Sequence, residues 1–178
     1  MNLSRLGHRR LATGVFLDYD RRYLIDEDRS VARDVVRHPG GIAILPVDRD
    51  TVWLVSQFRT AAGRRLLEIP AGKLDPAEKD LRRAARRELA EEIGATAAEL
   101  RHLTSMLPSP GYTDEVIHIY AATELLFGER RPDGAEERGM EVTIRTLGEA
   151  LDSIEGGEIV DAKTQIALLL WAQQRSHQ

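Results

Sequence analysis

The most informative absence in this sequence is cysteine, of which there is none. Without thiols the chain has no disulfide bond, no thiolate metal site and no cysteine nucleophile, and we expect a reducing, cytoplasmic compartment. Long apolar runs are also missing. None approaches the roughly 18 residues of a membrane span, and the first residues lack the apolar core of a signal peptide. These absences predict a cytoplasmic protein without a membrane partner.

An excess of basic residues is missing as well. The chain has 25 Lys and Arg against 29 Asp and Glu, a net charge of -4, which argues against a nucleic-acid partner. Its 178 residues, 42% hydrophobic and 30% charged, are typical of a soluble globular protein with one substantial core. We expect residues 1–38 to be an extended β segment, used in dimerisation, and residues 39–178 to be the main domain.

The order of expected elements indicates the fold class. Apolar residues alternate with polar ones in the N-terminal segment, and two apolar strands at 41–47 and 51–59 form a hairpin around a short Asp-rich turn. Residues 80–93 have helical spacing and end at Gly94. Further strands follow at 116–125 and 140–147, and two helices at 148–154 and 161–174 finish the chain. This order predicts an α+β or α/β sandwich.

The stretch "ARRELAEEIG", residues 85–94, concentrates charge on two helical turns. On a helix, Glu88 and Glu92 lie about 40° apart and Glu91 lies about 60° to the other side of Glu88, so the carboxylates share one flank. A solvated face with ion pairs such as Arg87–Glu91 is one interpretation. The other is a site for a hard cation such as Mg²⁺, because the carboxylates lie at the end of the helix that disfavours negative charge.

The span "GKLDPAEKDLRRAARRELAEEIGA", residues 72–95, resembles the Nudix box of the Nudix hydrolases. The resemblance implies a mixed β-sheet between helices and a divalent metal, Mg²⁺ with Mn²⁺ as the alternative. It assigns Glu88 and Glu92 as the best metal ligands and Glu91 as a third, with the Ala71 carbonyl as an extra ligand. Structural roles are implied for three further residues, Arg87, Gly72 and Gly94.

The first half of the box departs from the family pattern. Eight residues separate Glu78 from Arg87, where the family has seven, so Lys79 stands at the position expected for a glutamate. Either the loop carries a one-residue bulge, or the supporting glutamate is lost.

Three other stretches, "SQFR", "LEIPAGKLD" and "SPGYTDE", resemble the ADP-ribose pyrophosphatase group of the family. Read alone, the last is a simple turn, and Arg59 with Glu68 is a structural ion pair. The resemblance instead implies that a set of residues contacts the substrate, some of them from a neighbouring subunit. These are Arg59, Glu68, Arg33, Asp34, Gly111, Thr113 and Glu115.

The charged loop "RRPDGAEERGMEV" carries the expected catalytic base. Read alone, it is a solvated loop. In the group it resembles, a glutamate of this loop deprotonates or orients the attacking water. Glu136 takes that position and Glu137 is the second candidate, with Arg138 where some relatives have a carboxylate.

The resulting prediction is a metal-dependent hydrolase, acting through Glu92 and Glu136 or Glu137. We expect it to convert ADP-ribose to AMP and ribose 5-phosphate. Two alternatives stay open: a hydrolase of another nucleoside diphosphate sugar, carrying GDP or UDP, and a Nudix-fold binding protein without catalysis. An RNA pyrophosphohydrolase would require a more basic surface. We expect a homodimer, because the N-terminal segment has little core of its own.

Overall fold

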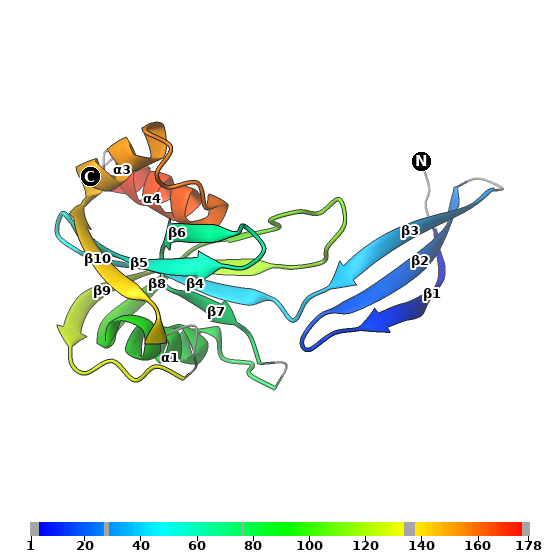
Figure 1. Cartoon of the computed structure of the whole chain (residues 1–178), viewed down its shortest axis with the longest axis horizontal. Helices are drawn as coiled ribbons and strands as arrows, with labels where there is room; N and C mark the ends of the chain where they lie inside the picture. Colours follow the sequence, from blue (N-terminus) through cyan, green and yellow to red (C-terminus); the bar gives the residue numbers. More distant parts are fainter. Residues whose placement is uncertain (1–3, 27–28, 76, 134–137, 176–178) are drawn as a thin grey trace. The chain divides into compact units, whose positions relative to one another are not determined.

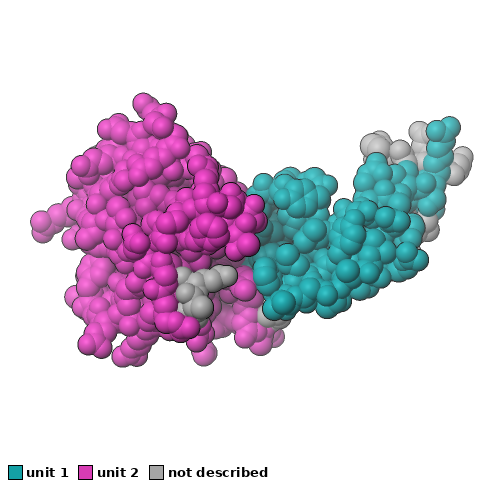
Figure 2. Space-filling model, viewed as in Figure 1, with its two compact units in different colours: residues 1–40, 107–116 teal, residues 41–106, 117–178 magenta. Residues whose placement is uncertain are grey.

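The computed structural model describes residues 4–26, 29–75, 77–133 and 138–175. The chain forms two compact units, which we describe separately (Figure 2). Unit 1 comprises residues 1–40 and 107–116, and unit 2 comprises residues 41–106 and 117–178. Of the helices in the described part, none is long and apolar enough to cross a membrane.

Unit 1 contains an antiparallel sheet in the order β1 (Ser4–Thr13), β2 (Asp18–Asp26) and β3 (Arg29–Arg37). Its other segment, residues 107–116, joins this sheet through a parallel bridge between Val36 and Thr113. Among the side chains described in this unit, no hydrophobic one is buried, whereas Asp20 is. The unit therefore has no apolar core of its own within the described residues.

Unit 2 is built around a mixed sheet in the order β10-β5-β4-β9-β8 (Figure 1). The central strand β4 (Gly41–Asp48) lies parallel to β9 (Ile117–Phe127), which pairs with β8 (Ala95–Met106). On the other side, β5 (Thr51–Arg59) pairs with β4 and with β10 (Glu141–Thr146). Two shorter strands complete it: β6 (Arg64–Glu68) on β5 and β7 (Ala71–Lys73) on β4.

Helices cover both faces of this sheet. Helix α1 (Leu81–Ile93) packs on one face, and α3 (Leu147–Glu155) and α4 (Ala162–Arg175) pack on the other (Figure 1). The side chains of β4 alternate between the two cores: Ile42 and Ile44 join the core under α1, while Ala43 and Leu45 join the core under α3 and α4. Alternate side chains of a strand point to opposite faces, so β4 is apolar throughout. The predicted sandwich of sheet and helices is confirmed.

Candidate active site

Helix α1 is set in register by its two ends. The side chain of Asp80 caps the start by accepting from the backbone N–H groups of Arg82 and Arg83, at 3.0 and 3.3 Å. Gly94 ends the helix in the left-handed conformation, with φ 67°, and its N–H donates to the Leu89 carbonyl. With both ends fixed, one face of the helix meets the sheet. That face carries the apolar residues of the core and also Glu88 and Glu92.

Glu88 and Glu92 are buried carboxylates facing strand β7. Glu88 is 3% exposed and Glu92 is 2% exposed. The backbone N–H of Ala71 donates to Glu92 Oε2 at 3.2 Å. A Cβ atom added at Gly72 would lie 2.0 Å from Glu88 Oε1, so the carboxylate lies directly against that glycine. Buried carboxylates are costly unless they are paired or bind a cation, which marks this pair as a functional candidate.

Arg87 links two of the glutamates. Its Nη2 lies 2.6 Å from Glu88 Oε1, and its Nη1 donates to Glu91 Oε2 at 2.7 Å. Burial lowers the pKa of Arg87, but the charges of Glu88 and Glu91 outweigh it and hold the pKa above its usual value. The Arg87–Glu91 pair expected from their spacing is confirmed. Arg87 therefore reduces the repulsion between neighbouring carboxylates on the helix.

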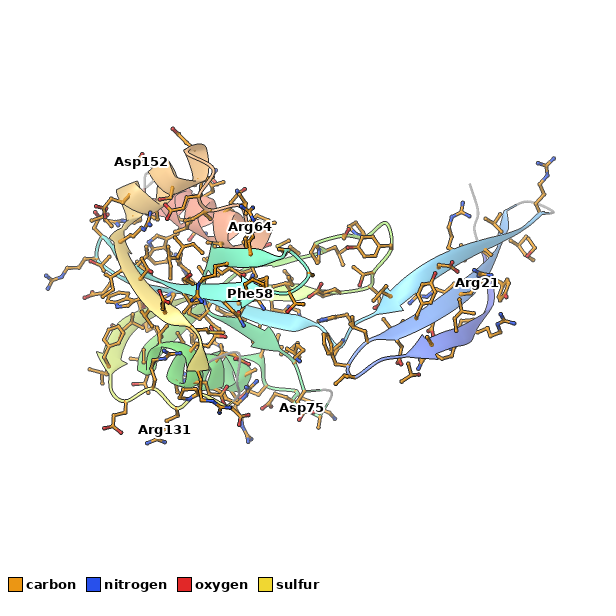
Figure 3. All side chains as sticks on the ribbon, viewed as in Figure 1. Arg21, Phe58, Arg64, Asp75, Arg131 and Asp152 are labelled. Carbon is orange, nitrogen blue, oxygen red and sulfur yellow. The ribbon has the colours of Figure 1, made fainter. Side chains whose placement is uncertain are left out.

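Arg59, at the end of β5, and Glu68, at the end of β6, form a bidentate ion pair. Arg59 Nε donates to Glu68 Oε1 and Arg59 Nη2 to Glu68 Oε2, both at 2.7 Å. These two strands run antiparallel, with Phe58 and Arg64 near their turn (Figure 3). Burial acts to raise the pKa of Glu68, but Arg59 and Lys163 outweigh it and the pKa lies below its usual value. Glu68 is thus charged although only 1% of it is exposed.

Lys163 is a residue of this cluster that sequence reasoning missed. It lies in the first turn of α4, is 9% exposed, and donates to Glu68 Oε2 and to Asp161 Oδ1. The available signal was the segment "DAKT", which places a lysine in the first turn of a helix whose residues 166–171 are apolar. Lysine is rarely buried without a partner, so burial of this helix start would require a carboxylate within reach of Lys163.

Glu78 does not join the glutamates of α1. Its Oε1 accepts from the backbone N–H of Asp80 at 3.2 Å, and its Oε2 lies 3.4 Å from Arg83 Nε. The contacts of Glu78 are therefore with the start of α1. Lys79, at the position where the family pattern has a glutamate, is exposed.

In unit 1, Arg33 and Asp34 have separate partners. Asp34 accepts two hydrogen bonds from Arg21, at 2.7 and 3.0 Å, and one from the Tyr19 hydroxyl at 2.9 Å. Arg21 first, and Tyr19 second, lower the pKa of Asp34 to about 2. Arg33 is exposed and donates to the carbonyl of the preceding residue, Ala32. The carboxylate is thus held in place within β1–β3, on which Figure 3 shows Arg21.

The "SPGYTDE" loop is fixed to β3 by Asp114. This carboxylate lies 2.9 Å from both Arg22 and Arg37, and it accepts from the backbone N–H of His38 at 3.0 Å. Among the predicted substrate residues here, Thr113 accepts from the N–H of Glu115 at 3.2 Å. Glu115 also lies 3.6 Å from His38, and Gly111 is exposed. The loop therefore has a defined conformation within unit 1.

The two candidates for the catalytic base, Glu136 and Glu137, lie outside the described residues. The backbone on either side of them is anchored: Gly128 N–H donates to Gly94 O at 2.7 Å, and Arg131 N–H to Ala90 O at 3.3 Å. On the far side, Arg65 donates to the Gly139 carbonyl at 3.1 Å. Both described ends of the loop thus belong to unit 2, with the first tied to α1.

Within the described part of the chain, no group of three or more acidic, histidine or cysteine side chains is arranged to hold a metal ion. Glu88, Glu91 and Glu92 therefore do not form a closed metal centre by themselves. What the structure offers is two buried carboxylates on one helix face, next to the backbone of Ala71 and Gly72. This is an open, oxygen-only donor set of the kind that magnesium sites use together with water and substrate oxygens.

Comparison with known proteins gives consistent matches. The NUDIX domain family model matches residues 37–164. An ADP-ribose pyrophosphatase of Bacillus subtilis (strain 168) is 42% identical over 137 residues, which cover 76% of this chain and 74% of that protein. A GDP-mannose pyrophosphatase of Escherichia coli O1:K1 / APEC is 36% identical over 155 residues, covering 82% of this chain and 78% of that protein.

One solved structure, of an ADP compounds hydrolase, superposes with a TM-score of 0.86. It covers 99% of this chain and 96% of the other, at 20% sequence identity. At that identity the likeness shows the fold.

Proposed function

Because the chain belongs to the NUDIX domain family, we propose that it is a hydrolase that cleaves the diphosphate of ADP-ribose to AMP and ribose 5-phosphate. The observation that carries this proposal is the site on α1: two buried glutamates, Glu88 against Gly72 and Glu92 against Ala71 of β7, in a chain 42% identical to an ADP-ribose pyrophosphatase. Buried carboxylates of this kind require a pairing cation or a bound metal, which is what a metal-dependent hydrolase needs at this position.

Members of the family generally use divalent metal ions, and the residues present fit one. We assign Mg²⁺, with Mn²⁺ as the alternative, and propose that Glu88, Glu92, Glu91 and the Ala71 carbonyl hold it. When bound, the cation neutralises the diphosphate oxygens and lowers the pKa of the attacking water. The protein's own part is to present hard oxygen donors from two buried glutamates, with Arg87 keeping adjacent carboxylates at a fixed spacing.

Arg59 is proposed to bind a phosphate of the substrate, with Glu68 orienting it. Guanidinium groups bind phosphate oxygens well because their N–H donors form a planar fork. Arg33, Asp34, Gly111, Thr113 and Glu115 complete the proposed substrate contacts. Asp34 and Glu115 are held by neighbouring side chains within unit 1, which supports a role that needs a fixed orientation.

Glu136 is proposed as the general base, with Glu137 as the second candidate. Support comes from the anchors on the flanking backbone, since a base on a loop needs fixed ends to reach one water reproducibly. If Glu136 is the base, its replacement by Gln should remove most of the turnover, and the same change at Glu137 should remove much less.

A second candidate function is hydrolysis of a GDP- or UDP-sugar. The observation in its favour is the 36% identity to a GDP-mannose pyrophosphatase over most of both chains. The metal-binding helix and the reaction would be the same, because both substrates present a diphosphate. The difference would lie in the contacts to the base and the sugar.

We also propose that the protein is a cytoplasmic homodimer. Support for the dimer is the absence of any buried hydrophobic side chain among those described in unit 1, where Val15, Phe16 and Tyr19 are exposed. A second copy of the chain would cover such a sheet. Light scattering combined with size-exclusion chromatography should give twice 19.9 kDa, and a mass of 19.9 kDa would rule the dimer out.

The first test is product release from ADP-ribose, NADH, GDP-mannose and UDP-glucose, each with Mg²⁺ and with Mn²⁺. We expect AMP and ribose 5-phosphate from ADP-ribose at the highest kcat/KM, and little turnover by the Glu92→Gln variant at the Mg²⁺ concentration that saturates the wild type. Preference for a GDP- or UDP-sugar would change the proposed substrate and leave the proposed metal site unchanged. Absence of metal-dependent turnover on the whole panel would contradict the proposal and favour a binding role.

A further inference from the structure

Lys163 is a buried cation at the centre of a four-residue charge cluster. Its amino group donates to Glu68 Oε2 and, at 2.9 Å, to Asp161 Oδ1. Burying an ammonium group has a large free-energy cost, and only close carboxylates offset it. A methionine or leucine would fill the same space between α4 and the sheet without this cost. The charge of Lys163 is therefore expected to have a role beyond filling this space.

The carboxylate of Glu68 is shared between two cations. Arg59 approaches both of its oxygens, and Lys163 approaches Oε2 from the α4 side. With Arg59 alone, the bidentate bond would fix the carboxylate relative to the guanidinium, but the two groups could still move together. The second donor removes that freedom. Glu68 is then fixed, and its two oxygens fix the plane of the Arg59 guanidinium.

Asp161, which accepts a hydrogen bond from Lys163, is itself held in place. Asp161 Oδ2 accepts from the backbone N–H of Thr164 at 3.0 Å and from its hydroxyl at 2.5 Å. The same hydroxyl accepts from the backbone N–H of Ile69 at 2.9 Å. The start of α4 is thus joined to the end of β6 at two successive positions, Glu68 and Ile69. The Thr164–Ile69 bond and the apolar core already attach the helix to the sheet, so attachment does not require Lys163.

Arg59 keeps one edge available. Its Nε and Nη2 are used by Glu68, while Nη1 makes no hydrogen bond with any described residue, and 36% of the side chain is exposed. The segment that follows Glu68 leads to the α1 glutamates: the N–H of Ala71, three residues later, donates to Glu92 at 3.2 Å. The hydrogen bond with Glu68 chiefly raises the pKa of Arg59, and the negative charge of Glu92 adds to it. For a phosphate bound near those glutamates, Nη1 is a donor that no acceptor among the described residues already uses.

We propose that Lys163 is a positioning residue for substrate binding: by fixing Glu68, it holds Arg59 with Nη1 directed at a phosphate of the nucleoside diphosphate substrate. This inference rests on the proposed function, because it assumes that Arg59 binds phosphate. Lys163 acts through Glu68 and Arg59 and does not touch the substrate.

The test compares Lys163→Met with wild type in steady-state kinetics. Arg59 would bind ground state and transition state alike, so we expect KM to rise about tenfold, the loss expected from one weakened charge-assisted hydrogen bond, with kcat within about twofold. Lys79→Met, at an exposed lysine before α1, is the matched control and should leave both constants unchanged. A lower kcat with unchanged KM would mean a smaller folded fraction, and it would overturn the proposal.

A double-mutant cycle shows whether Lys163 acts through Arg59. In the Arg59→Ala background, Lys163→Met should raise KM no further, because the group it positions is gone. Additive effects would overturn the inference. If Lys163→Met does not fold, Asp161→Asn tests the same step while keeping the lysine. It should raise KM in the same direction by a smaller factor, and a wild-type KM would overturn the proposal.

A spectroscopic measurement separates this inference from the proposed function. In protein with ¹⁵N-labelled arginine, the Nε–H signal of Arg59 is assigned by its loss in Arg59→Ala. We expect a sharp signal that is protected from exchange in the wild type, and broadening in Lys163→Met. An unchanged signal would overturn the positioning role even if ADP-ribose is the substrate. If another sugar nucleotide proves to be the substrate, the same kinetic comparison is made with it.

Discussion

The carboxylate of Glu88 occupies the space that any side chain at Gly72 would need. A Cβ atom at position 72 would lie 2.0 Å from Glu88 Oε1, 2.1 Å from its Cδ and 2.4 Å from its Oε2. The backbone of Gly72 is not in the left-handed region, which is occupied by glycines 40, 63, 94 and 157. Space, and not backbone conformation, is therefore the reason for glycine here. The strand β7 admits the buried glutamate only because position 72 has no side chain.

Replacing Gly72 by alanine should displace the Glu88 carboxylate and reduce kcat/KM by about 100-fold, the effect of a misplacement of roughly 1 Å at a reacting centre. The measurement is steady-state hydrolysis at saturating Mg²⁺, with the melting temperature recorded alongside. Gly148→Ala is the control, since a Cβ there meets nothing within 4 Å. It should be neutral or slightly stabilising. Wild-type activity of Gly72→Ala would show that the position of Glu88 does not matter for the reaction.

Helix α1 was predictable because its signals are local. Asp80 caps it, Gly94 ends it, and the spacing of apolar residues defines the buried face, so the observed helix Leu81–Ile93 agrees with the expected one. The hairpin at β4 and β5 and the two C-terminal helices were predictable for the same reason. Each of these features is set by residues within a few positions of one another.

The features that were not predictable depend on contacts across long stretches of chain. Lys163 and Glu68 are 95 residues apart, and no periodic pattern links them. Strand β8 (Ala95–Met106) was not expected as a strand, because polar residues with a bulge near His102 interrupt its alternation. The pairing of Thr113 with Val36, which places the "SPGYTDE" loop in unit 1, likewise arises only when the chain has folded.

The three glutamates of α1 should differ in their effect on metal affinity. Glu88 and Glu92 are buried beside β7, whereas the side chain of Glu91 is 15% exposed; Arg87 pairs with both Glu88 and Glu91. We expect Glu88→Gln and Glu92→Gln to raise the Mg²⁺ concentration needed for half-maximal activity at least about 100-fold, because each removes a proposed direct ligand. Glu91→Gln should have a smaller effect. EDTA should abolish wild-type turnover, and added Mg²⁺ should restore it. Equal effects of all three substitutions would contradict the distinction between the buried pair and Glu91.

The pKa of Asp34 should depend on Arg21. Arg21 and Tyr19 lower this pKa from 3.8 to about 2, so the charged carboxylate is favoured in the folded state. Its contribution to stability is therefore fully present above pH 3.8 and is lost as the pH falls through about 2. A ¹³C NMR titration of the carboxyl group should give about 2 in the wild type and a value closer to 3.8 in Arg21→Gln.

Two further variants test whether Arg21 is the main cause of the lowered pKa of Asp34. Tyr19→Phe should raise the pKa of Asp34 less than Arg21→Gln does, because the tyrosine is the second cause of the shift. Arg33→Gln is the matched control. Its guanidinium donates to the Ala32 carbonyl and not to Asp34, so the pKa should stay at about 2. A rise in Arg33→Gln as large as in Arg21→Gln would mean that the general charge of the sheet, and not the bidentate bond, sets the pKa.

Gly94 and Gly63 both have a positive φ, but they differ in the space that a Cβ atom would have. Both lie in the left-handed region, at 67° and 66°, where a Cβ costs roughly 1–2 kcal/mol. A Cβ at Gly63 meets nothing within 4 Å, whereas one at Gly94 would lie 2.7 Å from Gly128 O and 2.9 Å from Arg130 N. These are backbone atoms at the start of the loop that leads to Glu136, and they cannot move aside as a flexible side chain would.

We therefore expect Gly63→Ala to lower the free energy of unfolding by about 1–2 kcal/mol and Gly94→Ala to lower it by at least about 1 kcal/mol more. Urea denaturation of both variants measures the difference. Gly94→Ala should also reduce kcat, because the clash pushes the Gly128–Arg130 backbone, and with it the start of the loop that carries the proposed base, away from α1. Equal destabilisation of the two variants would show that backbone conformation alone requires Gly94, and that the contact between the helix end and the loop can relax without cost.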